Sequence, residues 1–208
     1  MRVLAVALLL FVQQVGVGQI QSWYEAGEYQ EIAERVEQIT NPMGTYLLGS
    51  SYERLDRFAE ARMAYQQLSA RDESDPWASI GRAAAALVAD GEAPPAEAVE
   101  EAFAAAQQAV ALVSGEPAVT GPVAAIAQYQ LGLVHAFRGD NAGAAEAFEA
   151  AQGNAPAFAY AYYYGGQAQS RLDRPDQMAI SFERFLQLAP DAPEARRVQS
   201  LMRSVRGR

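Results

Sequence analysis

The sequence predicts an all-α protein, an α-solenoid of antiparallel helix pairs that ends in a capping helix. Small residues recur along the chain at Gly49, Gly81, Gly132 and Gly166, and the last two are 34 residues apart. The apolar residues in these segments follow the helical period rather than the alternation of strands. Half of the 208 residues are hydrophobic and 20% are charged, which is typical of a folded chain and not of a disordered one.

Other residues follow the glycines at fixed distances. After Gly132 and Gly166 come a small or medium residue, an aromatic residue and a proline: Ala144, Phe148 and Pro156 in one case, Met178, Phe182 and Pro190 in the other. This pattern resembles the tetratricopeptide repeat, in which W-x₂-L-G-x₂-Y…A-x₃-F…P extends over about 34 residues. The resemblance covers roughly residues 20–190. It implies an α-solenoid whose concave groove binds peptides or partner helices.

The repeats divide the chain in order. We expect a signal peptide over 1–18 and one helical-repeat domain over 19–208, built from a half repeat (19–41), repeats of about 42–76, 75–117, 122–156 and 157–191, and a capping helix (192–206). Asp75 and Pro76 have the residue types of a helix cap and a first helical residue. In the repeat that they begin, the stretch ADGEAPPAE lengthens the turn between the two helices by about nine residues.

The stretch FAYAYYYGGQAQ, residues 158–169, has the local features of a strand followed by a turn. We predict a helix instead, because the repeat register outweighs the strand preference of tyrosine. Gly165 and Gly166 then allow a neighbouring helix to approach closely. On a helical wheel, Tyr162 falls among the core positions of the repeat.

The capping helix carries an apolar stripe made of Val198, Leu201, Met202 and Val205. Five arginines and no acidic residue lie from Arg196 onward. We interpret these arginines as a solvated face that complements the helix C-terminus. Contact with a membrane or an acidic partner is the alternative.

The first 18 residues have the three parts of a secretory signal peptide. Arg2 precedes an apolar run from Val3 to Val12, and the small residues Gly16 and Gly18 stand before a predicted cleavage site. The apolar run is too short to span a bilayer comfortably. We therefore expect a periplasmic or secreted protein. The alternatives are a buried first helix and a membrane anchor formed by an uncleaved signal.

The helical arc opposite the core positions predicts the binding surface. Seven residues of the last two repeats lie on it: Tyr129, Leu133, Phe137, Tyr160, Tyr163, Gln167 and Arg171. By the resemblance, this arc lines the concave groove. Aromatic residues with polar tips suit a half-wet groove, so we expect partly exposed side chains that bind a protein or peptide. The alternative is that tyrosines of adjacent helices pack against each other.

The composition excludes several kinds of chemistry. Without cysteine or lysine, the chain has no thiolate zinc site, no cysteine nucleophile and no lysine for phosphate or Schiff-base chemistry. His135, the only histidine, stands at the tyrosine position of the repeat, and we interpret it as a packed core residue. A net charge of −9 disfavours nucleic acid. We expect no catalytic residue, no metal, no cofactor and no small-molecule substrate.

These observations lead us to expect a non-enzymatic adaptor or scaffold of the bacterial cell envelope. Its concave groove would hold a peptide or a partner helix. A self-associating structural subunit of an envelope or secretion assembly is the alternative. Membrane contact is expected only through an uncleaved signal or the basic C-terminal helix.

The cleavage site gives the first test. We predict that protein recovered from the periplasm begins near Gln19, because the small residues Gly16 and Gly18 follow the apolar run. Mass spectrometry of the intact protein measures this end. Protein that retains Met1 in a soluble cytoplasmic fraction would contradict the prediction.

Overall fold

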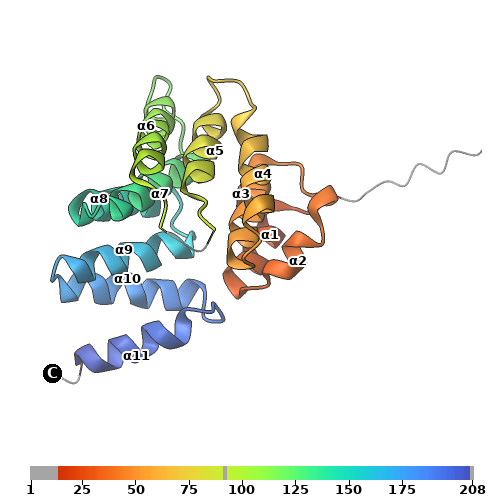
Figure 1. Ribbon diagram of the computed structural model, residues 1–208. Helices are drawn as coiled ribbons and strands as arrows, with labels where there is room; N and C mark the ends of the chain where they lie inside the picture. Colours follow the sequence, from red (N-terminus) through yellow and green to blue (C-terminus); the bar gives the residue numbers. More distant parts are fainter. Residues whose placement is uncertain (1–13, 91–92, 207–208) are drawn as a thin grey trace, which may run out of the picture.

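The computed structural model describes residues 14–90 and 93–206, whose regular secondary structure is entirely helical and includes no strand (Figure 1). The helices are α1 (Val17–Ala26), α2 (Tyr29–Ala33), α3 (Pro42–Arg54), α4 (Phe58–Ser69), α5 (Pro76–Leu87), α6 (Ala96–Val113), α7 (Pro122–Phe137), α8 (Asn141–Asn154), α9 (Ala159–Arg171), α10 (Pro175–Leu188) and α11 (Ala195–Arg206), with a short 3-10 helix at Val36–Gln38. The predicted all-α class is confirmed.

Consecutive helices form the pairs α3–α4, α5–α6, α7–α8 and α9–α10, and each pair packs against the next (Figure 1). The shorter helices α1 and α2 pack on α3, and α11 packs on α10 as the terminal helix. The arrangement is an α-solenoid of antiparallel helix pairs, as predicted. The stretch 158–169 lies almost entirely in α9, so the helical prediction for it is correct.

Short polar side chains and prolines fix where the helices begin. The side chains of Asn41, Asp75 and Asp140 accept hydrogen bonds from backbone N–H groups in the first turns of α3, α5 and α8. Proline occupies the first position of α3, α5, α7 and α10, where no intrahelical N–H donor is needed. The predicted cap at Asp75 and Pro76 is among them.

Close contacts between glycines and aromatic rings hold three of the pairs together. In each, a glycine of the first helix faces a ring of the second: Gly49 and Tyr65, Gly132 and Phe148, Gly166 and Phe182. A Cβ atom added at Gly132 would lie 2.7 Å from the Phe148 ring, which is closer than real Cβ contacts allow. Only a residue without a side chain lets the ring fill this space, so glycine at these positions sets the spacing of the pair.

The tight turns between paired helices share one backbone conformation. The φ angle is +76° at Gly139 and +54° at Asp173, one repeat later in the chain. In the earlier turns, Gly27 and Asp56 also have positive φ angles. Glycine adopts this left-handed conformation freely, and aspartate tolerates it better than most residues. The α5–α6 connection is longer and contains the ADGEAPPAE stretch, part of which lies outside the described residues.

The terminal segments differ in part from expectation. Most of the predicted signal peptide, residues 1–13, lies outside the described residues, whereas Val15 and Val17 pack against the core and α1 begins at Val17. In α11, Val198 and Met202 are buried, but Leu201 is 39% exposed, so the apolar stripe is narrower than predicted. The side chain of Val205 lies outside the described residues. Over the described ranges, no helix has the length and apolar character needed to cross a membrane.

We predict that Gly132→Leu destabilises the fold by about 1–3 kcal/mol, because the new side chain overpacks the contact with Phe148. Thermal or urea unfolding followed by circular dichroism measures the change. Gly153→Leu is the matched control, since a Cβ at Gly153 meets nothing within 4 Å. Equal unfolding midpoints for the two variants would show that the glycine does not set the spacing of the pair.

Candidate functional site

Side chains from the two ends of the solenoid contact each other across its concave side. The Tyr24 ring of α1 lies edge-on to the Tyr160 ring of α9, with centroids 5.2 Å apart. Tyr29 of α2 shares a hydrogen bond with Tyr160, with hydroxyl oxygens 3.2 Å apart, and the Gln21 amide donates to the Ala157 carbonyl at 3.5 Å. Side chains of the N-terminal half repeat therefore contact α9 and the segment before it, while the half repeat packs on α3.

An ion pair completes this contact between the two ends. Arg54, at the end of α3, donates to Glu194, in the turn before α11, with an N–O distance of 2.5 Å. Tyr160 donates to the other Glu194 oxygen at 3.0 Å, so Tyr29 is the donor to Tyr160. The Arg54 guanidinium also lies over the Tyr160 ring, 5.3 Å from its centroid. We call Tyr24, Tyr29, Arg54, Tyr160 and Glu194 the closing cluster.

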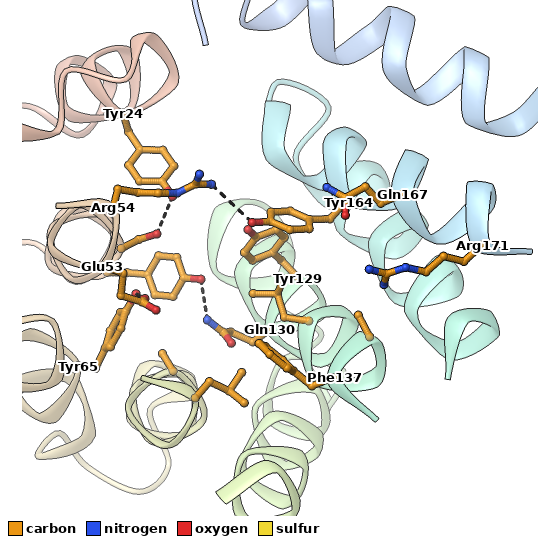
Figure 2. A pocket seen from close by; sticks show the side chains of 16 residues that line it. Tyr24, Glu53, Arg54, Tyr65, Tyr129, Gln130, Phe137, Tyr164, Gln167 and Arg171 are labelled. Atoms are coloured by element: carbon orange, nitrogen blue, oxygen red, sulfur yellow. Dashed lines mark hydrogen bonds between the residues drawn. The ribbon is translucent and has the colours of Figure 1, made fainter. Parts of the chain in front are cut away.

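Beside the closing cluster is a pocket of about 290 Å³ (Figure 2). Its lining side chains come from the first helices of the four pairs, with Tyr24 of α1 and Tyr65 of α4 as the two additions. The lining residues are Tyr24, Tyr46, Ser50, Glu53, Arg54, Tyr65, Ala84, Leu87, Tyr129, Gln130, Leu133, Ala136, Phe137, Tyr164, Gln167 and Arg171. The pocket is therefore the concave surface of the solenoid, narrowed by α1 and α9.

Two polar groups in the pocket wall lack a full set of partners. The Glu53 carboxylate accepts a hydrogen bond of 2.6 Å from the Tyr65 hydroxyl, but Glu53 is in none of the ion pairs that the described residues form. The Gln130 amide donates to the Tyr46 hydroxyl at 2.6 Å. Its oxygen is buried and has no donor within the described part of the chain. The Glu53 carboxylate and the Gln130 carbonyl oxygen therefore make this wall rich in hydrogen-bond acceptors.

Burial controls the protonation of the pocket residues. It raises the pKa of the Glu53 carboxyl above the ordinary 4.5, and the hydrogen bond from Tyr65 and the charge of Arg54 oppose the rise. Burial also raises the pKa values of Tyr46, Tyr65 and Tyr129 well above 10, so these side chains are neutral hydroxyls near neutral pH. Arginine stays charged at any such pH.

The structure brings together five of the seven predicted binding residues. Those that line the pocket are Tyr129, Leu133, Phe137, Gln167 and Arg171. Tyr163 lines a second, smaller hollow between α9 and α11, which Gln167 and Arg171 also border. Tyr160 lines neither of these hollows and belongs to the closing cluster. No sequence pattern indicated that Tyr24, Tyr65 and Gln130 would join the same wall, because their neighbours come from distant repeats.

The predicted exposure of the tyrosines is wrong. Tyr129, Tyr160 and Tyr163 are buried, with exposed fractions of 6%, 0% and 8%. The reason is that their arc packs against aromatic rings of other helices, Phe158 for Tyr129 and Phe185 for Tyr160 and Tyr163. The alternative, that tyrosines of adjacent helices pack together, describes them better. Leu133 is partly exposed and Phe137 is 52% exposed.

Tyr162 meets the expectation only in part, because it packs against the buried core without being buried itself. It is partly exposed, and its hydroxyl donates to the Pro156 carbonyl at 3.3 Å on the surface. Tyr164, two residues after Tyr162, lines the pocket and accepts a hydrogen bond from Arg54. The helical wheel separated two arcs, and in the solenoid both arcs of α9 pack against other helices. Among the four tyrosines, Tyr160 and Tyr163 are the most deeply buried.

His135 is packed edge-on to Phe103, with ring centroids 5.3 Å apart, and its Nδ1 lies 2.8 Å from an Asp140 oxygen. Both contacts hold the end of α7 against its neighbours. Within residues 14–90 and 93–206, no group of three or more His, Asp or Glu side chains is placed to hold a metal ion.

Comparison with known proteins identifies the fold. No protein-family model and no curated protein sequence matches the chain. TTC0263, a thermophilic TPR protein of Thermus thermophilus, is 18% identical, with 88% of this chain and 95% of that chain covered and a TM-score of 0.61. A chain of the APC/C hetero-tetramer Cut9–Hcn1 is 15% identical, with 89% of this chain and 35% of that chain covered and a TM-score of 0.56. The chain therefore has the tetratricopeptide-repeat fold.

The closing cluster gives a stability prediction. We predict that Arg54→Met costs about 1–3 kcal/mol of unfolding free energy, because it leaves Glu194, whose side chain is 11% exposed, without its cation. Arg62→Met is the control, since the ion pair of Arg62 with Asp90 is exposed and contributes less than about 1 kcal/mol. Urea unfolding at neutral pH compares the two. A loss no larger for Arg54→Met than for the control would contradict the role of the cluster.

Proposed function

We propose that this protein is a non-enzymatic binding module that holds a peptide or a helix of a partner protein in its concave groove. The observation that carries the proposal is the pocket itself. Its lining comes from all five first helices, α1, α3, α5, α7 and α9, and so depends on the complete solenoid. A site assembled from every repeat suits an extended ligand that runs along the groove.

The side chains at the pocket support binding of a polypeptide. Phe137 leaves about half of its surface exposed, and Leu133, one turn earlier on α7, is partly exposed. Gln167 and Arg171 lie on α9, across the pocket from the α3 wall (Figure 2). Aromatic residues and arginines dominate the binding energy of many protein interfaces. Exposed apolar area next to polar groups is what such a partner would cover.

We further propose that the module acts in the bacterial cell envelope, as an adaptor or scaffold. The support is the three-part pattern of the first 18 residues, with its charged, apolar and small-residue segments. Cleavage before Gln19 would remove Val15 and Val17, which pack against the core, and would leave Ile20 and Tyr24, which form the buried face of α1.

The proposal predicts where a partner touches the chain. A photoreactive benzoyl-phenylalanine in place of Phe137 should crosslink a partner polypeptide in cells of the source organism. The same group in place of Ile180 on α10, which is 68% exposed and lines none of the hollows described above, should not. Gel electrophoresis and mass spectrometry identify the product. Crosslinks at Ile180 alone would contradict the proposal, and crosslinks of Phe137 only to a second copy of this chain would favour the self-associating subunit.

A further inference from the structure

The side chains that line the pocket favour one chemical class of ligand, and the fold by itself does not determine that class. Its α3 wall presents the Glu53 carboxylate, and tyrosines from α1, α3, α4, α7 and α9 surround the space. The Arg54 guanidinium also lines the pocket and its charge favours the ionised Glu53 carboxyl, but Arg54 forms its ion pair with Glu194. A partly buried carboxylate outside any ion pair of the described residues is costly, and an entering cation that pairs with it would offset that cost. Aromatic faces attract the same kind of group through their quadrupoles.

The two arginines of the pocket do not satisfy Glu53. Arg54 is held by Glu194 in the closing cluster, on the side of Tyr29 and Tyr160. Arg171 lies on α9, on the opposite side of the pocket from Glu53 (Figure 2). The Tyr65 hydroxyl, a neutral donor, provides the 2.6 Å hydrogen bond to the carboxylate. The negative charge of Glu53 thus remains directed at the pocket.

Gln130 adds to the same potential. Its amide nitrogen donates to Tyr46, and its carbonyl oxygen has no donor among the residues that the structure describes. An unpaired carbonyl oxygen contributes a fixed negative partial charge to its surroundings. The whole chain is also acidic, with a net charge of −9, which attracts cationic ligands over longer distances.

The size of the pocket limits what can enter. A volume of about 290 Å³ is at the lower end of ligand sites, which are roughly 300–1,000 Å³. This space holds one long side chain of a peptide or helix that lies along the groove, and it does not enclose the helix itself. Phe137, 52% exposed, leaves apolar surface on which residues flanking that side chain can pack.

We propose that the partner is a polypeptide segment that inserts one arginine or lysine side chain into this tyrosine-lined pocket, where Glu53 receives its charge. This inference rests on the proposed function and specifies the chemistry of the ligand. Arginine has the more favourable geometry, because its planar group can stack on a tyrosine ring while it donates to a carboxylate.

Selection from a library of random short peptides displayed on phage tests the inference, with the full-length chain as bait. We expect enrichment of arginine- or lysine-containing peptides on the wild type. We expect this enrichment to be lost on Glu53→Gln, which keeps an acceptor for Tyr65, and to be retained on Glu149→Gln. Glu149 is exposed on α8 outside the pocket, so its substitution removes the same charge from the chain.

A second measurement does not depend on any variant of the protein. In a selected peptide, replacing the arginine by citrulline, which has nearly the same shape and no charge, should weaken binding at least about tenfold, or 1.4 kcal/mol. Fluorescence anisotropy of the labelled peptide gives the dissociation constants. Equal affinities would overturn the inference even if Glu53→Gln failed to fold.

The outcomes separate this inference from the proposed function. Enrichment of peptides without arginine or lysine would overturn the cationic preference and leave the groove as a binding site. Failure to enrich any peptide, together with a partner crosslinked at Phe137, would also overturn the inference alone. Failure of both experiments would contradict the inference and the proposed function together.

Discussion

The contact between the two ends of the chain determines the shape of the functional surface. A solenoid is held together by contacts between neighbouring repeats, and nothing in that principle brings the first helix to the last pair. Here the closing cluster does so: Tyr24 meets Tyr160, and Arg54 meets Glu194 across 140 residues of sequence. Because the ion pair is partly buried and shared with Tyr160, its loss leaves an uncompensated charge rather than a solvated one.

The closure turns an open groove into a pocket with defined chemistry. Tyr24 and Tyr164 reach the pocket from helices at the two ends of the array. A hydrogen bond with Ser50 orders Tyr24, and a hydrogen bond from Arg54 orders Tyr164. Arg54 is held by Glu194, and Glu53, the preceding residue, faces the pocket without an ion-pair partner among the described residues. The closing cluster thus contributes to the burial of Tyr160 and leaves the Glu53 carboxylate on the pocket wall. The proposed selectivity for a cationic side chain depends on this carboxylate.

Local and periodic features were predictable from the sequence, and the closure was not. The helix pairs follow from glycines and rings at fixed spacing, such as Gly132 and Phe148, which contact each other inside one repeat. The helical wheel also placed Leu133 and Phe137 correctly, because α7 borders the pocket directly. Periodicity gives no information on contacts between distant repeats, so Tyr160 was expected on a half-exposed surface and is fully buried. The unusual run of tyrosines was the one signal that this helix has aromatic neighbours on more than one side.

The most direct test of the account is the distance between the two ends in solution. The chain has no cysteine, so cysteines introduced at Ser22 in α1 and Ala157 before α9, both exposed, can carry spin labels selectively. Gln21, beside the first site, reaches the Ala157 backbone in the closed solenoid. Pulsed electron paramagnetic resonance should give a single short and narrow distance distribution, which broadens when Arg54→Met is added. A long or broad distribution in the otherwise unmodified protein would contradict the closure and the pocket that depends on it.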